Sequence, residues 1–204
     1  MTIKEFLKKF YFLVWKDESL LGWFISVIFL LIVLKFIFFP GLSLITQTAL
    51  PIAIVESCSM YHEGNSFSSY NTWWEQEKYK YEKFDISKDT FSNFIFKKGF
   101  NKGDILFIIG VNPTKLKVGE VIIFKDSTYQ NPIIHRIVKI KEENGTRTFA
   151  TWGDNNNAQL PAEKIIQEDQ IMGKAVTNVI PYAGWIKLIF FERLKPEYQR
   201  GFCN

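Results

Sequence analysis

The chain has 204 residues, of which 47% are hydrophobic and 17% aromatic, and its formal net charge is +4. This length suits one domain of ordinary size, with a substantial core, plus an additional segment. Basic and acidic residues are interspersed and form no basic block, so a nucleic-acid partner is not indicated. The only cysteines, Cys58 and Cys203, lack a C-x-x-C spacing and predict neither a zinc site nor a disulfide scaffold.

The N-terminal part of the chain predicts a membrane anchor. Residues 20–39 read LLGWFISVIFLLIVLKFIFF, which at about 1.5 Å per residue spans the roughly 30 Å of a bilayer core. Pro40 and Gly41 are expected to end this helix. The apolar run is too long for a cleavable signal peptide, whose core usually has about 7–15 residues.

The flanks of the span predict its direction. Residues 41–59 contain no Lys or Arg, whereas lysines precede the span at Lys4, Lys8, Lys9 and Lys16. The positive-inside rule then places the N-terminus in the cytoplasm and the chain after Pro40 outside a cell membrane that it crosses once. Residues 1–19 form an amphipathic cytoplasmic segment, expected to lie along the inner membrane surface or to extend the spanning helix.

The remaining chain predicts a mainly β fold, with an antiparallel β-domain over residues 40–184. Many short strand candidates with turn signals and no alternating helices favour this class, with a hairpin turn at Asn144-Gly145. The candidates are residues 51–56, 104–110, 120–125, 132–141, 146–152 and about 171–180. Residues 61–103 predict a helical, aromatic insertion that packs on the β-domain or binds the membrane. Residues 185–204 predict a membrane-proximal helix and tail, too short and charged to span.

Nucleophilic catalysis is the chemistry that the polar residues allow. It needs a hydroxyl or thiol, a base and a group that orients the base. Ser57 and Ser59 follow the first strand, His135 lies within an apolar strand on the face of Ile133 and Ile137, and Asp154 lies in a G-D-N turn. Each also has an ordinary structural explanation, as turn formers or a hydrogen-bonded core histidine. The histidines lack metal-ligand spacing, so no metal or cofactor is predicted.

The order of the short motifs along the chain supports nucleophilic catalysis. The chain carries S-x-S-M, then G-D before an apolar strand, V-G-E-V-I, I-I-H-R and G-D-N-N. This series resembles type I signal peptidases of the archaeal and endoplasmic-reticulum branch, in which His stands where the bacterial branch has Lys. The resemblance extends from the anchor to about Trp185. It implies Ser59 as nucleophile, His135 as general base, Asp154 as the acid that orients this base, and the Ser57 hydroxyl as an oxyanion donor beside the Ser59 amide.

Three departures from the family pattern leave alternatives open. Cys58 stands between the serines where Gly is usual, and its thiol is an alternative nucleophile. His62 follows Tyr61 where many relatives have Pro, and because it is near Ser59 in the sequence it is a rival base. Many relatives carry another Asp shortly after G-D-N-N, whereas NAQLPAEK offers none here. Further candidates for the supporting acid are therefore Asp104 and Asp169.

The resemblance implies a membrane-anchored serine endopeptidase that removes signal peptides from secretory preproteins at small-x-small sites. Its partners would be these preproteins and the lipid membrane, with no nucleic acid, metal or cofactor. The alternative is a catalytically inactive, membrane-anchored β-domain that binds secretory chains.

Overall fold

The computed structural model describes residues 2–63 and 70–203. The chain divides into two compact units, residues 1–45 and 46–204, each described here by itself. Positions 64–69 of the predicted insertion lie outside the described residues.

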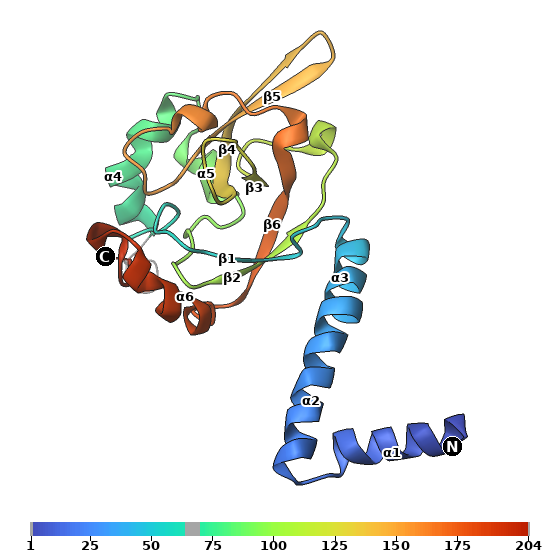
Figure 1. Ribbon diagram of the computed structural model, residues 1–204. Coiled ribbons are helices and arrows are strands. Elements are labelled where there is room, and N and C mark those ends of the chain that lie inside the picture. Colours follow the sequence, from blue (N-terminus) through green and yellow to red (C-terminus); the bar gives the residue numbers. More distant parts are fainter. Residues whose placement is uncertain (1, 64–69, 204) are drawn as a thin grey trace. The chain divides into compact units, whose positions relative to one another are not determined.

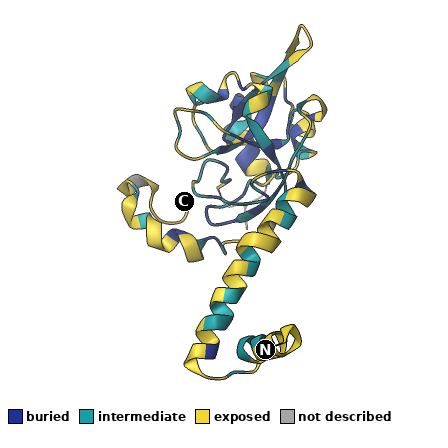
Figure 2. Cartoon of the chain, turned by 45° about the vertical axis from the view of Figure 1, so that its right-hand side comes forward, coloured by how far each residue is buried: buried dark blue, intermediate teal, exposed yellow. Residues whose placement is uncertain are grey.

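The first unit holds the two predicted N-terminal helices. Helix α1 (Ile3–Trp15) opens with a capping box between Thr2 and Glu5. Helix α2 (Leu20–Val33) begins at its N-cap Ser19, so α1 is a separate helix and not an extension of α2. The helix from Leu20 continues to Thr46, and its 27 residues are long and apolar enough to cross a membrane. Figure 2 shows how little of it is buried.

Pro40 does not end this helix, so that prediction was wrong. The helix passes through a π-helical turn, η1 (Leu34–Phe38), and continues as α3 (Phe39–Thr46). Proline lacks an N–H and its ring crowds the carbonyl four residues earlier. A wider π turn directly before Pro40 relaxes this crowding, and the Phe39 amide bonds to the Leu34 carbonyl there.

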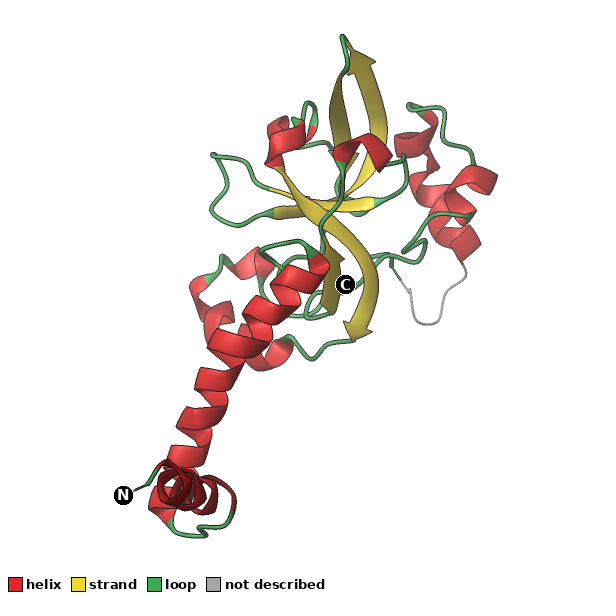
Figure 3. Ribbon diagram, turned by 90° about the vertical axis from the view of Figure 1, so that its right-hand side faces the viewer, coloured by secondary structure: helices red, strands yellow, loops and turns green. Residues whose placement is uncertain are grey.

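The second unit is built on one antiparallel sheet of six strands, which confirms the mainly β fold (Figure 1). The strand order is β1-β2-β6-β3-β4-β5. Figure 3 shows that the sheet is strongly curved and that β4 and β5 extend as a hairpin. The strands are β1 (Ile52–Ile54), β2 (Ile105–Ile109), β3 (Val121–Phe124), β4 (Ile133–Glu143), β5 (Thr146–Trp152) and β6 (Ile171–Ile180).

Burial on both faces explains the apolar sequence of strand β3. All of β3 is buried: Val121 and Ile123 join one apolar cluster and Ile122 and Phe124 another. A strand covered on both faces must be apolar at every position, as VIIF is.

The hairpin turn after β4 has positive φ at both Asn144 (52°) and Gly145 (78°), as a type I′ turn requires.

Two helices form the predicted insertion, α4 (Tyr70–Glu82) and α5 (Lys88–Ser92). Trp73, Trp74 and Tyr81 are buried, in one cluster with Val138 and Trp152 of the sheet. These aromatic side chains therefore pack on the β-domain.

The C-terminal segment begins with α6 (Trp185–Phe191) and continues through short 3₁₀ turns, η5 (Glu192–Leu194) and η6 (Glu197–Gln199). Within this segment, Cys203 forms a disulfide with Cys58. The cysteine spacing predicts no disulfide, and this prediction was wrong, because the two residues are 145 positions apart in the chain and only the fold brings them together. Further 3₁₀ turns are η2 (Pro113–Lys115), η3 (Pro161–Glu163) and η4 (Glu168–Gln170).

Candidate active site

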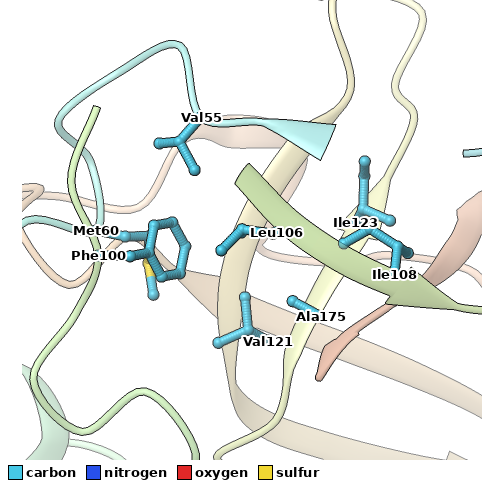
Figure 4. Packing of buried hydrophobic residues seen from close by; sticks show 8 residues of the cluster. All are labelled: Val55, Met60, Phe100, Leu106, Ile108, Val121, Ile123 and Ala175. Carbon is cyan, nitrogen blue, oxygen red and sulfur yellow. The ribbon is translucent and has the colours of Figure 1, made fainter. Parts of the chain in front are cut away.

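Ser57 and Ser59 lie in the short segment that leaves β1. The next residue, Met60, is fully buried in one cluster with Phe100 and Leu106 (Figure 4). This apolar anchor holds the end of the segment, while Ser57 is exposed and Ser59 partly exposed. The two hydroxyl oxygens lie 3.1 Å apart. Within the described chain, the Ser59 amide N–H donates to no acceptor.

A turn after β5, residues 153–156, holds this serine segment in place. The Asn155 amide donates to the Ser59 carbonyl at 2.8 Å, and Asn155 Nδ2 donates to the Cys58 carbonyl at 3.0 Å. The Asp154 amide points to the Met60 sulfur at 3.4 Å. Consecutive residues of one turn thus bind three consecutive residues around the nucleophile candidate.

The same turn lies against His135, which is buried on β4. A Cβ added to Gly153 would be only 2.8 Å from His135 Nε2, so this nitrogen lies directly against the turn backbone. Asn155 and Gly153 are two residues apart, so one short turn contacts both the Ser59 carbonyl and the His135 ring. Within the described residues, no hydrogen bond joins the Ser59 hydroxyl to the His135 ring; the hydroxyl bonds to Ser57 instead.

The carboxylate that binds His135 is Glu163, at the end of η3. Its Oε1 lies 2.5 Å from His135 Nδ1 and accepts a hydrogen bond from the Thr151 hydroxyl at 3.1 Å. Its Oε2 accepts from the Leu160 amide at 2.7 Å. Glu163 is fully buried and its orientation is fixed by these bonds. A buried carboxylate on Nδ1 selects the tautomer whose Nε2 can accept a proton.

Asp154, expected on His135, belongs to a different network. Its carboxylate accepts from Arg136 Nη2 at 2.6 Å and Nε at 2.9 Å, from the Tyr81 hydroxyl at 2.8 Å, and pairs with His62 Nε2 at 2.8 Å. Lys80 donates to the Asp154 carbonyl at 2.9 Å. Arg136, Asp154, Lys80 and Tyr81 are all buried almost completely. The structure thus gives Asp154 other partners than His135.

Strand alternation is the physical reason. His135 and Arg136 are consecutive, so their side chains leave opposite faces of β4. Arg136 pairs with Trp152 and Ile137 with Thr151 in the register of β4 and β5. Because side chains alternate between the two faces, Thr151 and Gly153 lie on the face of His135, and Trp152 and Asp154 lie on the face of Arg136. Glu163 reaches the first face and bonds to both His135 and Thr151.

Burial and charge set the ionisation of the second network. Burial alone would raise the pKa of the Asp154 carboxyl, but the guanidinium of Arg136 and the His62 hydrogen bond outweigh it and hold this pKa well below its usual range. Burial lowers the pKa of His62 despite its bond to Asp154. Burial thus favours the neutral form of His62, in which Nε2–H donates to the ionised Asp154 carboxylate. Burial beside Asp154 also raises the pKa of Tyr81 well above its usual value.

Three relatives of the chain are each described as the catalytic subunit of a signal peptidase complex. The human signal peptidase complex catalytic subunit SEC11C is 30% identical over 105 residues, covering 48% of this chain and 54% of that protein. The Dictyostelium discoideum subunit sec11 is 31% identical over 99 residues, covering 46% and 54%. The Eremothecium gossypii subunit SEC11 is 26% identical over 171 residues, covering 81% and 80%. No family model matches the chain.

The chain is a homologue of signal peptidase catalytic subunits. This confirms the resemblance found in the motifs. The matched region spans about half the length of the first of these curated relatives.

This chain has Cys58 where signal peptidase homologues usually have Gly, which makes the Cys58 thiol an alternative nucleophile. The disulfide to Cys203 removes that thiol. His62, the rival base, uses its Nε2 on Asp154 and stacks on Trp73 with ring centroids 3.5 Å apart. Its ring is therefore committed to the buried network.

The two reserve acids also lie elsewhere. Asp104 is buried and accepts from the Asn178 side chain at 2.7 Å and from the Tyr182 amide at 3.0 Å, which fixes the turn after β6. Asp169 is exposed in η4. Neither side chain bonds to His135 in the described part of the chain.

Glu163 is the site residue that the sequence interpretation missed. It lies in NAQLPAEK, the stretch that lacks the second Asp of many relatives. A usable signal was present: Pro161 opens a 3₁₀ turn whose third residue, Glu163, caps the Leu160 amide and so points back towards the sheet. Among the described residues, no group of three or more His, Cys, Asp and Glu side chains could hold a metal ion.

Proposed function

We propose that this chain is a membrane-anchored serine endopeptidase that removes signal peptides from secretory preproteins at small-x-small sites. The observation that carries the proposal is the turn 153–156, which binds the Ser59 carbonyl through Asn155 and lies against His135 Nε2 through Gly153. Signal peptidase homologues and the S-x-S-M, H-R and G-D-N-N motifs support the substrate class.

The proposed roles follow from the contacts. The Ser59 oxygen attacks the scissile carbonyl carbon while His135 Nε2 takes its proton, and the C–N bond breaks as His135 returns that proton to the leaving amine. Water then hydrolyses the acyl-enzyme by the same proton transfers. Glu163 holds the imidazole and stabilises its cationic form. The Ser59 amide and the Ser57 hydroxyl donate to the developing oxyanion.

Strand β1 offers a docking edge for the substrate. It pairs with β2 on one side and with no strand on the other in the described sheet. An extended peptide laid along this edge would run towards Ser59, and shallow pockets beside it would accept small side chains.

The membrane arrangement of the proposed enzyme has the N-terminus in the cytoplasm, one span within Leu20–Thr46 and the β-domain outside. The lysine-rich N-terminal flank supports this direction. The Cys58–Cys203 disulfide also fits an oxidising compartment outside the cytoplasm. On α6 and η5, apolar side chains are exposed and suit contact with lipid: Ile186, Ile189, Phe190 and Leu194.

Cleavage of a model preprotein in proteoliposomes tests the proposal. Ser59→Ala should lose on the order of 10⁶-fold in turnover, and Ser57→Ala roughly 10²–10³-fold. Thermal unfolding of each variant controls for folding, since both changes remove one oxygen from a partly or fully exposed side chain. Binding of the preprotein without cleavage by the wild-type chain would favour the inactive binding domain instead.

A further inference from the structure

The C-terminal segment, Trp185–Cys203, is fastened to the segment that carries the serines. Lys187 Nζ pairs with Glu56 Oε1 at 3.0 Å, and Lys195 Nζ donates to the Glu56 backbone carbonyl at 2.8 Å. Cys203 then forms the disulfide with Cys58. Three bonds from this segment therefore reach the residues directly before Ser59.

The other side of the segment is held by a buried lysine. Lys102 is 1% exposed, and its Nζ donates to Glu192 Oε2 and to the Gln199 carbonyl, both at 2.7 Å. Glu192 Oε2 also accepts from the Gly201 amide at 2.9 Å. The Trp185 ring lies against Gly103, where a Cβ would come within 2.2 Å of it. The segment thus has a defined position on the domain and can impose one on Cys58.

The serines have few other restraints on this side. Residues 56–59 belong to no strand or helix, and Ser57 is exposed. The turn 153–156 holds the carbonyls of Cys58 and Ser59, whereas the disulfide holds the side chain between the two hydroxyls. Loss of the disulfide would leave the bonds of Lys187 and Lys195 to Glu56 and the turn contacts to the Cys58 and Ser59 carbonyls, but would free the Cys58 side chain between the two hydroxyls. Cys58 and Cys203 are both partly exposed, so a small reductant has access to them.

We propose that the Cys58–Cys203 disulfide makes the C-terminal segment a positioning element for Ser59, so that reducing this bond slows cleavage without abolishing substrate binding. The exchange is balanced by an added dithiol: its two sulfurs become a disulfide, and Cys58 and Cys203 become thiols. The inference rests on the proposed function for its kinetic readout. A displacement of about 1 Å at a nucleophile can cost on the order of 10²-fold in rate.

The experiment uses the full chain in proteoliposomes and a model preprotein. Oxidised wild type, dithiothreitol-reduced wild type, Cys203→Ser and Cys58→Ser/Cys203→Ser are compared for kcat and KM. Reduction and Cys203→Ser should each lower kcat about 10–100-fold with KM changed less than about threefold. Reoxidation should restore the wild type, and the double variant should not respond to dithiothreitol. Equal kcat in oxidised and reduced wild type would overturn the inference.

Two further measurements distinguish a failure of this inference from a failure of the proposed function. Hydrogen–deuterium exchange of residues 56–61 should rise on reduction, whereas exchange in β3 and β4 should not; unchanged exchange in 56–61 contradicts the inference whether or not the chain is a peptidase. Absence of cleavage by oxidised wild type contradicts the proposed function alone. If the cysteine variants unfold, reversible reduction of the wild type, with thermal unfolding recorded in both states, still decides the question.

Discussion

Glu163→Gln is the substitution that tests the assignment of the supporting acid most directly. The change keeps the size of the side chain but replaces one carboxylate oxygen by NH₂. In the structure, Oε1 faces His135 Nδ1 and Oε2 faces the Leu160 amide, and both partners are donors when Nε2 of His135 is the base. An amide can accept at only one of these two places.

Either orientation of the new amide is unfavourable. With the NH₂ towards Leu160, two donors face each other in a buried site; with the NH₂ towards His135, the wrong tautomer is stabilised. The cationic imidazole also loses its buried counter-charge. An acid-to-amide change in a serine-protease triad costs about 10⁴ in kcat, and we expect a loss of about 10³–10⁴ here. Stability should fall by about 1–3 kcal/mol through the unpaired donor.

Asp154→Asn is the matched control, because it is the same chemical change on the acid first expected to orient His135. It leaves the buried Arg136 without a full counter-charge, so we expect a loss of about 3–5 kcal/mol in the free energy of unfolding. For a domain of this size that is a fall of about 6–20 °C in Tm. Steady-state cleavage, with Tm for each variant, distinguishes the two. Near-normal kcat in Glu163→Gln with a large loss in a folded Asp154→Asn would refute the reasoning.

Three other predictions concern the same turn and its supports. Gly153→Ala should lower kcat about 10²-fold, measured on folded protein, because its Cβ would lie 2.8 Å from His135 Nε2. Tyr81→Phe should cost about 1.5–3 kcal/mol in urea unfolding with little change in kcat, since it removes one donor to a buried carboxylate. Burial lowers the pKa of His62 in the folded chain, so as the pH drops below about 6.5 the unfolded chain is protonated first and the free energy of unfolding falls. His62→Gln should therefore make the free energy of unfolding, measured in urea, depend less on pH between about 7.5 and 5.5. An unchanged slope of stability against pH would contradict this prediction.

The strands could be predicted because their signals are local. VIIF, the IIHRIV run and the Asn144-Gly145 turn each specify a nearby conformation, and the observed bounds of β5, Thr146–Trp152, match the expected ones. The Ser57–Ser59 segment also follows its strand as expected. Such features need only the alternation of side chains and the chemistry of turns.

Three features of the structure differ from what the sequence predicts. The disulfide joins residues 145 positions apart, and no spacing rule pairs them. The helix end at Pro40 was misjudged because a π turn can absorb a proline where a regular α-helix cannot. Glu163 does not fit the family pattern, which predicts an Asp, although a Glu side chain is one methylene longer and reaches β4 from a 3₁₀ turn.

The division between the two acids could have been anticipated from alternation alone. His135 and Arg136 are neighbours on one strand, so a single carboxylate beside the strand cannot face both side chains equally. The guanidinium, which is always charged, takes the acid that is buried on its own face, Asp154. With its charge balanced by Arg136, Asp154 serves to hold the turn that binds Ser59, while Glu163 on the opposite face bonds to the titratable imidazole. Two adjacent residues thereby separate the network that maintains the geometry from the network that we propose moves the proton.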